Sequence, residues 1–167
     1  MLYLQPVSLT DGKEFYDMLQ RIPPENGFIN SAYQMDHTAF PTWLEKKVLM
    51  AQGIGLEDWQ VASSTYWLMD TGAPVGMGNL RHRLTDALRE GGGHIGYAVA
   101  SDQHGKGYGK ELLRLLLDEA RRMGITEEIL VTVHPGNTAS RRVAEANGGE
   151  LRRETEERVY YWFRSEK

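Results

Sequence analysis

The chain has no cysteine among its 167 residues. Disulfides, thiolate metal sites and a covalent cysteine intermediate are therefore excluded, and nothing else in the sequence predicts a metal. No segment approaches the roughly 20 apolar residues that a membrane-spanning helix requires. The N-terminus also lacks the basic region and long apolar run of a signal peptide. These absences predict a cytoplasmic protein with no membrane partner.

The sequence also lacks an excess of charge of either sign. Its 19 Lys and Arg against 23 Asp and Glu give a formal net charge of −4. No block of basic residues exceeds a few positions, so a nucleic-acid partner has no support. The hydrophobic fraction of 41% and charged fraction of 25% are ordinary for a globular protein. Since no linker, repeat or low-complexity tract appears, we predict one domain over residues 1–167.

Hydrophobic periodicity and turn residues predict strands and helices in alternation. The clearest helix spans 107–123, where four leucines and Ala120 share one face and charged residues cover the other. Thr10 or Asp11 is the expected cap of the first helix, and Asn137 that of the last. The predicted helices are 10–21, 40–52, 84–90, 107–123 and 137–146; the predicted strands are 2–9, 63–69, 74–83, 95–100, 129–133, 150–153 and 158–164. A strand–helix–strand unit in the middle implies a right-handed crossover, so the expected class is α+β with a mixed sheet.

A glycine-rich turn between the strand at 95–100 and the long helix organises the chain. Gly105, Gly107 and Gly109 alternate with Lys106 and Tyr108. With so few Cβ atoms the backbone can approach a ligand closely, and the helix start adds unpaired amides and a positive dipole end. We expect a phosphate site here. The P-loop pattern fails at two positions, and the dinucleotide fingerprint fails because Lys110 replaces its third glycine.

The spacing His104-x-x-Gly107-x-Gly109 resembles the Arg/Gln-x-x-Gly-x-Gly/Ala motif of the GCN5-related N-acetyltransferase (GNAT) family. A second family feature, Asn-x-x-Ser, is present as Asn137 to Ser140. The flanking stretches 79–84 and 93–97 make the chain similar to a bacterial subgroup of predicted acetyltransferases. The resemblance implies the GNAT-like acyl-CoA N-acyltransferase fold, with the order β-α-α-β-β-β-α-β-α-β-β and splayed central strands. That order matches the predicted elements.

The resemblance further implies acetyl-CoA as cosubstrate, with no metal. In the family the loop amides hold the cofactor's pyrophosphate, and the edges of the splayed strands pair with its pantetheine arm. The positions that carry over are Ala98, Val99, His104, Gly105, Lys106, Gly107, Tyr108, Gly109, Lys110, Asn137 and Ser140.

Two positions depart from the family pattern. His104 stands where Arg or Gln is usual, and Ala144 stands where many members carry a tyrosine that protonates the CoA thiolate. Three functions therefore stay open. The first is an N-acetyltransferase that moves acetyl directly to a primary amine of a small molecule or peptide, assisted by a general base. The second is a non-catalytic acyl-CoA-binding sensor or scaffold protein. The third is an NAD-type nucleotide enzyme.

The general base has three candidates. His134 follows the strand at 129–133 and is expected to face the cleft; a histidine that satisfies a turn with Pro135 is the alternative. His94 begins the strand that leads to the expected thioester, and its unperturbed pKa suits proton transfer; a hydrogen-bonded histidine at a strand end is the alternative. Glu25 lies in the loop between the first two helices, where the family often builds its acceptor pocket; a solvated carboxylate is the alternative. The stretch Arg81-His82-Arg83 is a candidate for binding an acidic acceptor; a strand whose side chains alternate between core and solvent is the alternative. Homodimers are common in the family, but the sequence leaves the oligomeric state open.

Overall fold

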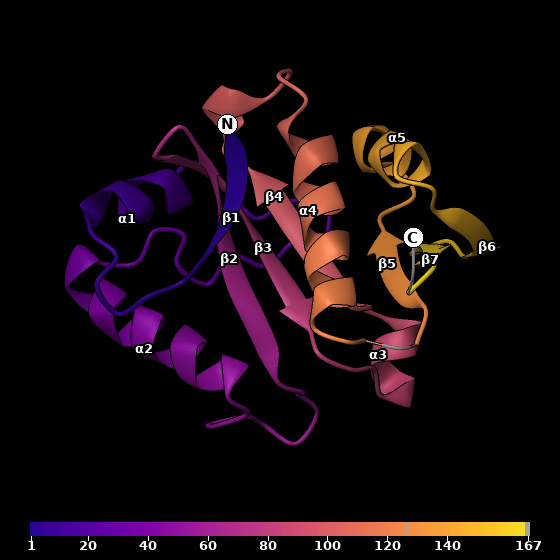
Figure 1. The fold of residues 1–167 in the computed structure, drawn as a ribbon, viewed down its shortest axis with the longest axis horizontal. Helices are drawn as coiled ribbons and strands as arrows, with labels where there is room; N and C mark the ends of the chain where they lie inside the picture. The colour runs from indigo at the N-terminus through magenta and orange to yellow at the C-terminus, as the bar shows by residue number, and fades with distance from the viewer. Residues whose placement is uncertain (126, 166–167) are drawn as a thin grey trace.

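The computed structural model describes residues 1–125 and 127–165. Figure 1 shows strands in the centre with helices on both sides. In chain order the elements are β1 (Leu2–Pro6), α1 (Lys13–Leu19), the 3₁₀ turn η1 (His37–Ala39), α2 (Phe40–Ala51), β2 (Ser63–Asp70), β3 (Ala73–Arg81), α3 (Asp86–Glu90), β4 (Ile95–Val99), the 3₁₀ turn η2 (Ser101–Gln103), α4 (Tyr108–Arg122), β5 (Ile129–Val133), α5 (Thr138–Ala146), β6 (Glu150–Glu154) and β7 (Val159–Phe163). The predicted order and the α+β class are confirmed. No helix of these described stretches is long and apolar enough to cross a membrane.

The strands form two antiparallel sheets. One has the order β1-β2-β3-β4 and the other the order β5-β7-β6. The gap in pairing falls between β4 and β5, the two strands that α4 connects. The central strands are therefore separated, as the sequence analysis predicted.

Helix α4 packs over the seam between the two sheets (Figure 1). Its leucine face is buried, and close packing is possible because β3 presents glycines to it. A Cβ built on Gly78 would lie 2.6 Å from Leu116 Cδ1, and one on Gly76 would lie 2.8 Å from the Ala98 carbonyl oxygen. Helices α1 and α2 cover the opposite face through a second core that includes Trp67. Side chains alternate across a strand, so β3 serves both cores.

The expected cap of the first helix is wrong. Helix α1 begins at Lys13 with Gly12 as its N-cap, which makes no side-chain capping bond. The Asp11 carboxylate instead accepts hydrogen bonds from Trp67 Nε1 at 2.7 Å and from the Ser8 N–H at 2.7 Å. A buried indole N–H needs an acceptor, and that requirement outweighs the local capping preference. The expected cap of α5 is confirmed, since Asn137 Oδ1 accepts from the Ser140 N–H at 3.1 Å.

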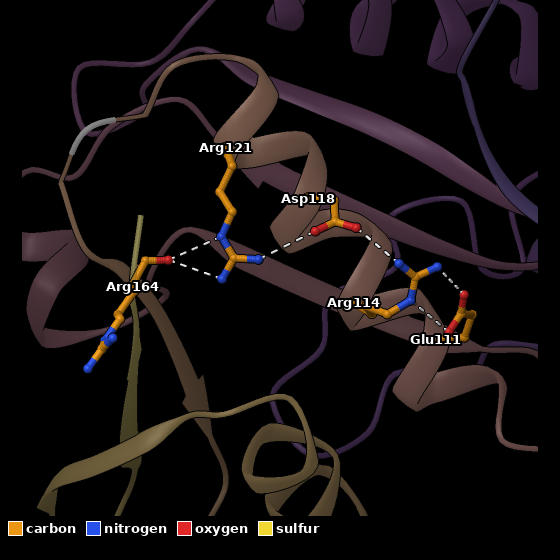
Figure 2. A network of polar contacts seen from close by, with 5 residues as sticks. All are labelled: Glu111, Arg114, Asp118, Arg121 and Arg164. Carbon is orange, nitrogen blue, oxygen red and sulfur yellow. Dashed lines mark hydrogen bonds and ion pairs between the residues drawn. The ribbon is translucent and has the colours of Figure 1, made fainter. Parts of the chain in front are cut away.

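The solvent face of α4 carries a chain of charges (Figure 2). Arg114 bonds Glu111 one turn before it and Asp118 one turn after it, the latter at 3.0 Å. Arg121 bonds Asp118 at 3.4 Å and donates to the Arg164 carbonyl at the end of β7, at 3.1 Å from Nη2. Spacings of three and four residues place these side chains on one helix face. Through Arg121 the network connects the last turn of α4, the end away from the glycine-rich turn, to the second sheet.

Candidate functional site

Strands β4 and β5 are joined at their beginnings by one residue. The His94 N–H donates to the Leu130 carbonyl at 2.8 Å, and His94 Nδ1 accepts from the Leu130 N–H at 2.9 Å. Gly93 makes this approach possible, because a Cβ there would lie 2.7 Å from the Leu130 carbonyl oxygen. Beyond this junction the two strands belong to different sheets. His94 therefore holds the two strands together at the point from which they separate.

His94 is fully buried, and both of its ring nitrogens are engaged. Its Nε2 lies 3.0 Å from Glu127 Oε1, while Nδ1 accepts from backbone. Burial lowers the pKa of His94, although the Glu127 carboxylate acts in the opposite direction. Since Nδ1 is an acceptor, the neutral ring carries its proton on Nε2 and donates it to Glu127. The side chain does not line the cavity between the strands.

A cavity of about 1040 Å³ occupies the opening between β4 and β5. Its wall includes the glycine-rich turn, the start of α5, the loop after α1 and the β6–β7 turn. Glu25 lies on its wall and is exposed. The predicted cofactor residues on the wall are Ala98, Val99, His104, Gly105, Gly107, Tyr108, Gly109, Lys110, Asn137 and Ser140. Lys106 does not line it; its Nζ donates to Gln103 Oε1 at 2.9 Å.

The glycine-rich turn presents a row of unused donors to the cavity. Gly105 and Gly107 have left-handed φ values of 81° and 80°. In the described part of the chain, no backbone N–H from Gly105 to Lys110 donates to another residue. These amides precede and open α4, a 15-residue helix, so the helix dipole adds positive potential. A Cβ on Gly105 or Gly107 would meet open space. The glycine-rich turn therefore suits a diphosphate. The family resemblance implies that the diphosphate of CoA binds there.

The start of α5 forms the facing wall. Asn137 caps the helix through its side chain, and Asn137 and Ser140 both border the cavity. Ala144, at the position of the usual family tyrosine, is fully buried in the core. A side chain at that position therefore contributes nothing to the cavity here.

Tyr97 is a cavity residue that the sequence analysis did not assign to the site. It comes from β4, and its hydroxyl is buried without a hydrogen-bond partner among the described residues. Burial raises the pKa of Tyr97; Ser140 would lower it but is not placed for a proper hydrogen bond. A buried unpaired hydroxyl on a cavity wall needs a partner. In the sequence Tyr97 stood out only as part of the stretch 93–97 that carries the family resemblance, between Gly96 and Ala98.

Over residues 1–125 and 127–165, no group of three or more His, Cys, Asp or Glu side chains converges as metal ligands would. The arrangement instead offers backbone donors, a separated strand edge and an unpaired hydroxyl around one cavity. Such a site can hold a long phosphate-bearing ligand and expose its far end to a second substrate.

Known structures share this architecture. RimL, a ribosomal L7/L12 α-N-protein acetyltransferase in complex with coenzyme A, matches with a TM-score of 0.69 at 15% identity, covering 96% of this chain and 92% of that one. The yncA protein of Salmonella typhimurium, with its cofactor acetyl-CoA, matches with a TM-score of 0.65 at 16% identity, covering 100% and 95%. The aminoglycoside acetyltransferase AAC(6')-Ib, in complex with coenzyme A, matches with a TM-score of 0.65 at 19% identity, covering 97% and 93%. These likenesses show the fold.

The family itself is shown by sequence. No curated protein matches the chain. A family model described as the acetyltransferase (GNAT) domain, however, matches residues 1–150. The match includes the glycine-rich turn and the Asn-x-x-Ser stretch, and the structural likenesses cover the whole fold. The chain belongs to the GNAT acetyltransferase family.

Proposed function

We propose that the protein transfers an acetyl group from acetyl-CoA directly to a primary amine of a small molecule or peptide. The observation that carries this proposal is the row of unpaired amides from Gly105 to Lys110 beside the opening between β4 and β5. Family membership and the CoA ligands of the neighbours named above support it. In this proposal the amides hold the diphosphate, and the edge of β4 at Ala98 and Val99 pairs with the pantetheine arm.

Acetyl transfer to an amine needs a proton removed and a leaving thiolate stabilised. Glu25 is the base that we propose, acting directly or through water, because it is exposed on the cavity wall. We propose a structural role for His94, which is to hold β4 and β5 together, because both of its ring nitrogens are engaged in hydrogen bonds.

Tyr97 is the group that we propose for the leaving sulfur. Its pKa is raised above the ordinary value near 10, and an ordinary thiol has a pKa of about 8.5. Full proton transfer to the thiolate is therefore uphill. The hydroxyl stabilises the sulfur by donating a hydrogen bond, and water completes the protonation. Tyr97 would then take the role of the tyrosine that many family members carry at the position of Ala144.

The test is CoA thiol release with a panel of amines, combined with mass spectrometry of the acceptor. We expect an acetylated amine and one thiol per product molecule. Tight binding of acetyl-CoA without release for any acceptor would instead support the sensor or scaffold function. Thermal stabilisation by NAD and not by CoA would support the nucleotide enzyme.

A further inference from the structure

We propose that Arg81 binds a carboxylate of the acceptor, and that the acceptor is an extended molecule whose reacting amine lies on the order of 10 Å from that carboxylate. The inference rests on the proposed function, because the cofactor occupies the glycine-rich end of the cavity and leaves the other end to the acceptor. Arg81 borders the cavity near the start of β4, where its Nη1 donates to the Gly93 carbonyl, whereas the glycine-rich turn follows the end of that strand.

Arg81 is a half-buried cation that has no carboxylate partner among residues 1–125 and 127–165. It is the last residue of β3, and side-chain alternation places it with Met77 on the α1 and α2 face. Its one side-chain hydrogen bond in the described part of the chain runs from Nη1 to the Gly93 carbonyl at 3.0 Å. Burial lowers the pKa of Arg81, and no charged neighbour contributes. Partly buried charges require a partner, so the remaining guanidinium donors are available to a ligand.

The surroundings of Arg81 favour an anion. Gly91 and Gly92 have no side chains to fill the space beside two guanidinium groups: a Cβ on Gly92 would lie 3.0 Å from Arg81 Nη1, and one on Gly91 2.9 Å from Arg158 Cζ. Arg158 has Glu157 at 3.5 Å, but that carboxylate is 81% exposed. Two arginines and two exposed carboxylates, Glu25 and Glu157, border the cavity, and among the described residues neither carboxylate pairs with Arg81. A planar guanidinium matches a carboxylate in two parallel hydrogen bonds, which the ammonium groups of a polyamine cannot accept.

The strand register sets the length of the acceptor. Met77 pairs with Ala98, where we place the thioester at the end of the pantetheine arm, and Arg81 lies four residues farther along β3. At about 3.3 Å per residue that separation is roughly 13 Å. A carboxylate in contact with the guanidinium is then on the order of 10 Å from the amine. An extended peptide advances about 3.3–3.6 Å per residue, so about three residues span the distance.

Part of the cavity wall is apolar. Ile29 is 81% exposed and Trp59 is 55% exposed, and both border the cavity together with the half-buried Phe28. Large apolar side chains exposed on a cavity wall are typical of a binding surface. Small apolar side chains in the middle of the acceptor would cover them, which makes alanine peptides suitable probes.

The experiment measures thiol release with alanine, dialanine, trialanine and tetra-alanine, each as the free acid and as the C-terminal amide. The quantity of interest is the ratio of kcat/KM for acid over amide at each length. We expect a ratio of at least tenfold for trialanine and a ratio near one for alanine. In Arg81→Met the trialanine ratio should fall to about one. Because the ratio is taken within one variant, partial loss of folded protein cancels.

Arg83→Met is the matched control, since Arg83 is exposed and does not line the cavity. It should keep the wild-type ratio. An acid preference that persists in Arg81→Met, or no acid preference at any length, would overturn the inference. If no acceptor releases thiol, the proposed function fails and calorimetry on the CoA-saturated protein decides the inference. Trialanine acid that binds to wild type and not to Arg81→Met supports it; no binding of the acid overturns it.

Discussion

Replacing Gly107 by alanine separates ligand binding from folding, because the two ends of α4 offer a matched pair of glycines. Gly107 precedes the helix with φ +80°, and Gly124 follows it with φ +81°; a Cβ at either position would meet open space. Only Gly107 borders the cavity. The two substitutions therefore carry the same backbone cost and differ in what the new methyl group faces.

The expected stability loss follows from the left-handed backbone. A residue with a Cβ costs about 1–2 kcal/mol in this conformation, and the lower entropy of the unfolded alanine variant offsets about 0.4–1 kcal/mol. Gly107→Ala and Gly124→Ala should each lose about 1 kcal/mol of unfolding free energy. Urea denaturation measures this, with an unchanged m-value showing that the native state stays compact.

CoA binding should respond very differently in the two variants. A methyl group on Gly107 projects toward the bound diphosphate and displaces it from neighbouring amides. Hydrogen bonds to a charged group contribute about 1.5–3 kcal/mol each, so the loss of two weakens binding at least about 100-fold. Calorimetry should show this loss in Gly107→Ala and wild-type affinity in Gly124→Ala. Unchanged affinity in Gly107→Ala, or an equal loss in both variants, would refute the assignment of the turn.

Three further predictions concern other positions. Tyr97→Phe should lower kcat about tenfold or more with little change in KM for acetyl-CoA, because one hydrogen bond to a developing thiolate contributes about 1.5–3 kcal/mol; a change in KM alone would argue against a role at the sulfur. His94 has a lowered pKa in the folded protein, so the unfolded chain binds more protons below about pH 6.5 and wild-type stability falls with pH there. The difference in unfolding free energy between wild type and His94→Gln should therefore shrink as pH falls through this window; a difference that stays constant would contradict this. Asn30→Ala should cost about 3 kcal/mol by denaturant unfolding, since the buried Asn30 amide donates to two carbonyls of the α1 end at 2.9 Å each and accepts from one N–H; a loss below about 1 kcal/mol would contradict this.

Much of the fold could be predicted because its signals are local. The buried face of α4 is formed by leucines at helical spacing within one short stretch. The cap of α5 depends on Asn137 and a residue three positions later. The glycine-rich turn is likewise one continuous stretch. In each case the interacting groups lie within one or two helical turns, so composition and spacing carry the information.

The structural role of His94 and the surroundings of Arg81 could not be predicted, because the residues that contact them are distant in sequence. His94 meets Leu130 and Glu127, which follow more than thirty positions later. Its type and place on a strand were compatible with a base, and only these contacts show that its nitrogens are engaged. Asp11 was a plausible helix cap by its type and position. Its carboxylate instead accepts from Trp67, which is 56 positions later and which the local sequence could not identify. The stretch Arg81-His82-Arg83 was singled out as a whole, and only the fold shows that Arg81 borders the cavity while Arg83 does not.

A crystal structure of the protein with CoA would test the central claim most directly. We predict diphosphate oxygens within about 2.7–3.2 Å of backbone nitrogens between Gly105 and Lys110, and the pantetheine arm between β4 and β5. CoA bound elsewhere, or absent from that opening at saturating concentration, would contradict the account.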